Sequence, residues 1–233
     1  MHGIQALLSA QDVPVAPDSL HHAAILIGIR QEIHIAITQQ RSITLSLNSF
    51  NVDRTLGPTD DCTWANRVIL YLIDITNYCF GHDEELVAPH SQLQEYLDQW
   101  MTLIPTSFTP IFFSPATQDR IFPKILPLSD PVVTGLLHYY LGRILLTAHT
   151  PKIPRVGPAR LAALKKIDEE IRRDACMLVG IAESINRMHP SYVTASIGIA
   201  LAGDRFTEHS EQKLLLEILK KTENSYGWST SAA

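Results

Sequence analysis

The sequence predicts an all-α protein, a single bundle of about seven helices with a loop rich in proline and phenylalanine that wraps around it. Three observations support this fold class. Apolar residues recur at three- and four-residue spacing in seven segments, as on one face of a helix. One of these segments, residues 129–149, is apolar on most sides, which is typical of a helix surrounded by others. No segment shows a strong strand pattern.

The first predicted helix follows a short N-terminal arm, residues 1–17. It begins at Asp18 or Ser19 and ends near Gln40. We predict a helix because the apolar residues of this segment lie on one stripe: Ala23, Leu26, Ile29, Ile33 and Ile37. Residues 33–37 alternate and would by themselves also fit a strand. The length of the whole pattern favours a helix.

Two more helices are expected after a loop at residues 41–60. One covers about residues 63–80 and ends at Gly81, which can adopt the left-handed conformation common at helix C-termini. The other covers residues 91–103 and opens with Ser-Gln-Leu-Gln, a capping-box pattern.

Residues 129–149 form the predicted central helix of the bundle. Pro131 suits its first turn, and Pro151 follows its end. The segment before it, residues 105–131, combines several prolines with several phenylalanines. Prolines prevent a continuous helix there, and a flexible hinge would not need so many aromatic residues. We therefore expect an ordered loop that wraps the bundle.

Three helices complete the predicted bundle, at residues 158–186, 191–201 and 207–225. The first carries a heptad-like apolar seam that is broken only at Asp168. The second consists largely of small residues, which permit close approach of a neighbouring helix.

Composition limits the classes of function. Nineteen Lys and Arg against 24 Asp and Glu give a net charge of −5, so we expect no direct binding of nucleic acid by this chain. Cys62, Cys79 and Cys176 are too scattered for a disulfide framework or a zinc site, and we predict neither a metal nor a cofactor. No apolar run reaches the roughly 20 residues of a membrane span, so we expect no membrane partner and a location inside the cell.

The histidines show no spacing typical of metal ligands. We interpret most of them as surface or loop residues, namely His21, His22, His34, His90, His149 and His209. No catalytic motif is recognisable either, because the sequence has no phosphate-binding loop, nucleophile elbow or His-Glu-x-x-His helix.

The candidate site residues are charged and polar groups inside apolar helices. Asp74 and Arg143 both lie mid-helix, where an unpaired buried charge would cost several kcal/mol. We predict that they pair with each other across two helices, and a purely structural ion pair is one interpretation. The alternative is a ligand-binding site made by His138, Tyr140, Arg143 and Asp74.

Several stretches resemble a known family. They are RQEIHIAITQQR at 30–41, WANRVILYLIDITNYCFG at 64–81, LDQWMTLIPTSFTPIFF at 97–113, LLHYYLGRILLTAH at 136–149, and the tail from Ile185. In their order along the chain and in their residues they resemble the fungal-specific transcription factor domain, type 2, of the fungal binuclear-zinc-cluster regulators. The resemblance covers most of residues 18–230 and implies a helical regulatory-like domain. The six-cysteine zinc cluster that contacts DNA in that family has no counterpart in this sequence.

The resemblance implies a nuclear protein that regulates transcription, often of metabolic or secondary-metabolite genes. Its partners would be other proteins of the transcription machinery or a small-molecule effector, with homo-oligomers also possible. The alternative is an enzyme or metabolite-binding protein of a fungal secondary-metabolite pathway, repurposed from this domain and located in the cytoplasm.

Overall fold

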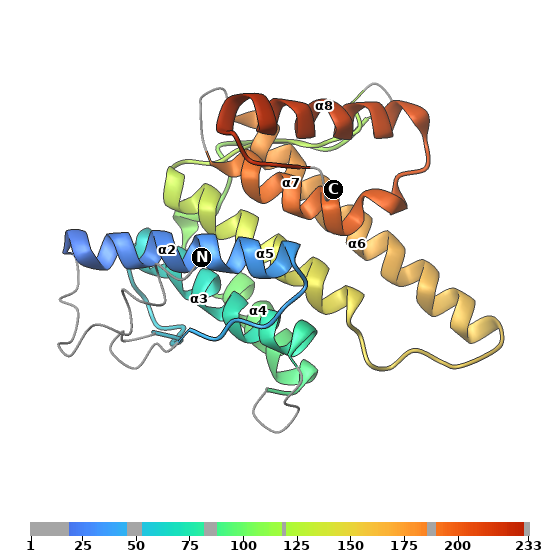
Figure 1. Cartoon of the computed structure of the whole chain (residues 1–233), viewed down its shortest axis with the longest axis horizontal. Coiled ribbons are helices and arrows are strands. Elements are labelled where there is room, and N and C mark those ends of the chain that lie inside the picture. The colour runs from blue at the N-terminus through green and yellow to red at the C-terminus, as the bar shows by residue number, and fades with distance from the viewer. Residues whose placement is uncertain (1–18, 46–52, 82–87, 118–119, 186–189, 231–233) are drawn as a thin grey trace.

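The predicted all-α bundle is confirmed by a computed structural model, which describes residues 19–45, 53–81, 88–117, 120–185 and 190–230 (Figure 1). Seven α-helices lie within these ranges: α2 (Leu20–Thr38), α3 (Asp61–Phe80), α4 (His90–Thr102), α5 (Asp130–Ala148), α6 (Pro158–Ser184), α7 (Ser191–Ala202) and α8 (His209–Tyr226). The predicted N-terminal arm, residues 1–17, lies outside the described residues.

Helix α5 is the centre of the bundle, as predicted, and it packs against α3, α4, α6 and α7. Most of its side chains are buried. Two glycines allow the closest packing. A Cβ atom on Gly135 would lie 3.2 Å from the Cβ of Ala65, and one on Gly142 would lie 3.2 Å from the side chain of Leu72. The small residues therefore let α3 lie directly against α5.

The helix ends match the sequence only in part. Ser19 caps α2, since its hydroxyl accepts a hydrogen bond from the backbone N–H of His22 at 3.0 Å. Gly81 ends α3 but has an extended conformation, so the predicted left-handed residue is wrong there. Helix α4 begins after Pro89 and has no side-chain cap, so the predicted capping box is also wrong. The capping-box pattern starts two residues after the N-cap, too far into the helix to bond its free amides.

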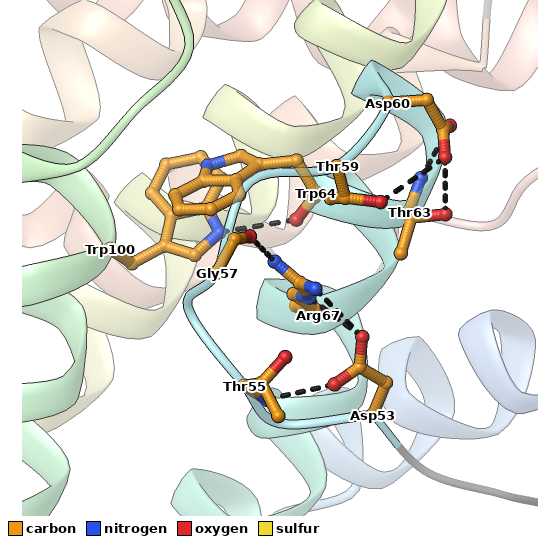
Figure 2. A network of polar contacts seen from close by, with 9 residues as sticks. All are labelled: Asp53, Thr55, Gly57, Thr59, Asp60, Thr63, Trp64, Arg67 and Trp100. Atoms are coloured by element: carbon orange, nitrogen blue, oxygen red, sulfur yellow. Dashed lines mark hydrogen bonds and ion pairs between the residues drawn. The ribbon is translucent and has the colours of Figure 1, made fainter.

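The loop before α3 is held by one buried cation (Figure 2). The guanidinium of Arg67 donates from Nε to the Asp53 carboxylate at 2.9 Å and from Nη1 to the Gly57 carbonyl at 2.6 Å. One helical turn before Arg67, the indole N–H of Trp100 donates to the Trp64 carbonyl at 3.1 Å. These bonds fix residues 53–60 and α4 to the same helix.

The segment before α5 contains a hairpin that the sequence did not predict. Strands β1 (Phe112–Ser114) and β2 (Lys124–Leu126) pair antiparallel, with Phe113 opposite Ile125. Three-residue strands are too short to leave a periodic signal. Strand β2 packs on α6, where the backbone N–H of Ile125 donates to the Ser184 hydroxyl at 2.9 Å.

Helix α6 joins the core only in its second half. Leu161 is 71% exposed and the Asp168 side chain 57% exposed, whereas Ile171 is fully buried. The predicted apolar seam is therefore wrong at Leu161, because the start of α6 extends beyond the other helices (Figure 1), whereas Leu164 is half-buried. The acidic residue of α6 that is buried in the core is Asp174, at 2% exposure.

Among the described helices, none is both long and apolar enough to cross a membrane.

The contact between α6 and the hairpin gives a stability prediction. A Cβ atom on Gly180 would lie 2.4 Å from the Pro123 carbonyl oxygen, so G180A must displace backbone and should lower the free energy of unfolding by about 1–3 kcal/mol. The matched control is G57A, because a Cβ atom there meets nothing within 4 Å. Denaturant unfolding measures both. Equal stability of G180A and G57A would contradict the packing.

Candidate functional site

A cavity of about 450 Å³ lies between α2, α5, α7 and the segment that follows α8. Its walls are mainly apolar, and the apolar residues are Ile27, Leu137, Pro190, Val193 and Trp228. Its polar residues come from the same helices and include Arg30 and His34 of α2 and Thr134 and His138 of α5. Cavities of this size that combine apolar wall area with converging polar groups are typical of small-molecule sites.

Two buried histidines from different helices meet in the cavity wall. The Nε2 atoms of His34 and His138 are 3.2 Å apart, and the two rings stack with an angle of 14° between them. His138 is 1% exposed and His34 is 6% exposed. Two ring nitrogens can form a hydrogen bond only if one of them carries the hydrogen. The pair therefore requires one donor and one acceptor.

The surroundings of His138 determine which ring donates. Its Nδ1 atom lies 2.7 Å from the carbonyl oxygen of Thr134. A carbonyl can only accept, so Nδ1 of His138 carries the hydrogen, and Nε2 of the neutral ring is the acceptor. His34 must then donate from Nε2. We call this chain of Thr134, His138 and His34 the histidine relay.

Burial keeps both rings of the relay neutral. Loss of hydration lowers the pKa of His34 to about 3, and the positive charge of Arg30 acts in the same direction. The pKa of His138 is lowered for the same reason, with smaller contributions from His34 and Arg30. A neutral His34 that carries its hydrogen on Nε2 has a free lone pair on Nδ1. That nitrogen has no hydrogen-bond partner among the described residues.

An unsatisfied donor lies one helical turn before this acceptor. The Nε atom of Arg30 is buried and has no hydrogen-bond partner among the residues that the structure describes. Burial also lowers the pKa of Arg30. A buried donor without a partner costs about 1–3 kcal/mol, and four other such side-chain atoms of the described residues lie outside the cavity lining. Arg30 and His34 thus present a free donor and a free acceptor on one face of α2.

The C-terminal segment completes the cavity. Helix α8 ends at Gly227, whose left-handed conformation, with φ at 62°, turns the chain. The next residue, Trp228, lies edge-on to the ring of His34, with 6.3 Å between the ring centroids. The indole therefore forms one wall of the cavity and touches the relay.

Of the four predicted ligand-binding residues, only His138 lines this cavity. The predicted pair of Asp74 and Arg143 is wrong. Both carboxylate oxygens of Asp74 bind Arg54, at 2.8 and 3.0 Å, and Arg143 binds Asp174 at 2.7 Å. The reason is that Asp74 is half-buried and meets residues 53–60, whereas Asp174 of α6 is buried against α5.

The surroundings of Arg143 are structural. Its guanidinium also donates to the Tyr139 hydroxyl at 3.4 Å. Burial alone would lower the pKa of Arg143, but the hydrogen bonds to Asp174 and Tyr139 raise it. The neighbouring Tyr140 has a pKa raised to about 12 by burial. The interpretation as a structural ion pair thus holds for Arg143, with Asp174 as its partner. A ligand-binding role of Tyr140, Arg143 and Asp74 stays a prediction.

The sequence reasoning missed three residues of these networks. The predicted surface position of His34 is wrong, since the residue is buried, and the predicted site does not include Arg30 or Asp174. Helical spacing is the sequence signal that identifies these residues. Residues 27, 30, 31 and 34 all line the cavity and share one face of α2. Asp174 lies on the buried face of α6 that Ile171 marks.

No family model matches the chain, and no curated protein or solved structure matches it significantly. The described residues contain no group of three or more His, Cys, Asp and Glu side chains that could hold a metal ion.

The Arg143 network yields a second stability prediction. Replacing Asp174 with Ala leaves a largely buried guanidinium without its carboxylate, so D174A should cost about 3 kcal/mol of unfolding free energy. The double variant D174A/R143M should cost clearly less than the sum of the two single variants. The control is D74A, whose partner Arg54 is solvent-exposed, and it should cost less than about 1 kcal/mol. Additive effects of D174A and R143M in urea melts would refute the coupling.

Proposed function

We propose that this protein is a transcription-regulator-like protein that binds a small, mostly apolar molecule in the cavity between α2, α5 and α7. The single observation that supports this best is the free donor and acceptor of Arg30 and His34 within an apolar cavity. Such a site is incomplete without a ligand because Arg30 Nε and His34 Nδ1 lack hydrogen-bond partners among the described residues. The resemblance of residues 18–230 to fungal regulatory domains supports the regulatory part of the proposal.

Binding would be communicated through the C-terminal segment and through protein contacts. A ligand in the cavity contacts Trp228, which follows α8, and at the same time contacts α2, α5 and α7. It would therefore favour the arrangement in which these four parts of the chain are held together. With a net charge of −5, the surface suits protein partners better than nucleic acid. We propose other proteins of the transcription machinery as these partners, and the nucleus as the location.

An enzyme of a secondary-metabolite pathway is the second candidate, and the relay is the observation that favours it. The free Nδ1 of His34 could accept a proton from a substrate as a general base. A general base works best when its pKa lies near the working pH, however, and the pKa of His34 is about 3. This ring is a good hydrogen-bond acceptor and a weak base. Binding is therefore the better-supported function.

A ligand screen tests the proposal. The whole chain would be titrated with a diverse collection of metabolite-sized compounds by calorimetry and tryptophan fluorescence. Trp64 and Trp100 are fully buried and do not line the cavity. A fluorescence change on binding that is absent in W228F therefore comes from Trp228. We expect at least one compound to bind, and V193W, which fills the cavity, to weaken binding at least tenfold.

The control variant is L216W, which adds the same side chain at an exposed position of α8. It should bind like the wild type. Failure of the whole collection to bind, or equal binding by V193W, would contradict the proposed function. Chemical conversion of a bound compound over time would favour the enzyme instead.

A further inference from the structure

We propose that the ligand of this cavity is an uncharged molecule that carries a hydroxyl group, and that this hydroxyl bridges Arg30 and His34. The inference rests on the proposed function, since it names the chemistry of the molecule that fills the same cavity. It depends on the direction of the hydrogen bonds in the relay, which follows from the contact geometry of two neutral, buried rings.

The relay leaves one acceptor, Nδ1 of His34, without a hydrogen-bond donor among the described residues. The Thr134 carbonyl fixes the hydrogen of His138 on Nδ1, and His138 in turn fixes the hydrogen of His34 on Nε2. The Nδ1 atom of His34 is thereby an acceptor, so the ligand must donate to it. A ligand group that only accepts would place its lone pair against that of the nitrogen.

The second polar group in the wall, the guanidinium of Arg30, requires a hydrogen-bond acceptor. This guanidinium lines the cavity and can only donate hydrogen bonds, so the ligand must also accept. Arg30 and His34 are four residues apart on α2 and thus neighbours on one face of the helix. A hydroxyl group donates one hydrogen bond and accepts others through the same oxygen. It satisfies both residues with a single atom.

The charges of the cavity select a neutral molecule. The lining contains one cationic residue, Arg30, and one acidic residue, Asp130, while both histidines of the relay are neutral. The charges of the wall therefore balance without a ligand. A carboxylate would add an unbalanced charge in a mainly apolar cavity and would offer His34 no hydrogen. An ammonium group would offer Arg30 no acceptor.

The test compares matched compounds that differ in one group: 2-naphthol, 2-methoxynaphthalene and 2-naphthoate. At about pH 7 the phenol is neutral and has both a donor and an acceptor, the ether only accepts, and the carboxylate is charged. By calorimetry on the whole chain we expect 2-naphthol to bind about tenfold more tightly than either of the others, the usual effect of one satisfied hydrogen bond.

Two variants locate the effect. H34F keeps an aromatic ring but removes the acceptor, so 2-naphthol and the ether should bind this variant with about equal affinity. R30M removes a donor that has no partner among the described residues, so it should keep the wild-type melting temperature while it weakens binding of 2-naphthol about tenfold. R30M keeps the proposal falsifiable if H34F does not fold.

The outcomes separate this inference from the proposed function. Equal or tighter binding of 2-naphthoate or the ether would overturn the hydroxyl assignment and leave the cavity as a binding site. If other compounds of the collection bind but none of the three naphthalenes does, the hydroxyl assignment is also overturned and the cavity remains a binding site. If R30M binds 2-naphthol as well as the wild type does, the bridge is wrong. If nothing binds in the cavity at all, both proposals fall.

Discussion

Burial of most of α5 is the constraint on which the rest of the structure depends. A helix enclosed by α3, α4, α6 and α7 cannot hydrate its polar side chains, so each of them must find a partner on a neighbouring helix. His138 finds His34 on α2, and Arg143 finds Asp174 on α6. These two polar contacts fix the rotation of α5 within an otherwise non-directional apolar core, and they connect it to helices on different sides of the bundle.

The two contacts differ in how completely they are satisfied, and that difference indicates where function lies. Arg143 has both a carboxylate and a tyrosine hydroxyl, so its network is closed. The histidine relay ends instead at an acceptor, Nδ1 of His34, beside the buried and unsatisfied Nε of Arg30. Stability alone would favour closing this second network. Its open end lies at a cavity, where a ligand can complete it.

The sequence allowed the helices to be predicted, because apolar periodicity over ten or more residues is a strong local signal. It could not predict features that depend on distant neighbours. The sequence has no signal for the fact that Gly81 is extended, or that the first half of α6 projects from the core. Partner choice is equally non-local. Asp74 was paired with Arg143 because both lie in apolar helices, yet the nearer cation is Arg54, from a loop that local periodicity cannot place.

The hydrogen positions in the relay are the most direct test of this account. Nitrogen chemical shifts of ¹⁵N-labelled histidines distinguish a protonated from a bare ring nitrogen, and the variants H34F and H138F assign the signals. At about pH 6 the account predicts two neutral rings, with the hydrogen of His138 on Nδ1 and that of His34 on Nε2, because burial lowers the pKa of both. A cationic His34 at this pH, or a hydrogen on Nδ1 of a neutral His34, would contradict it.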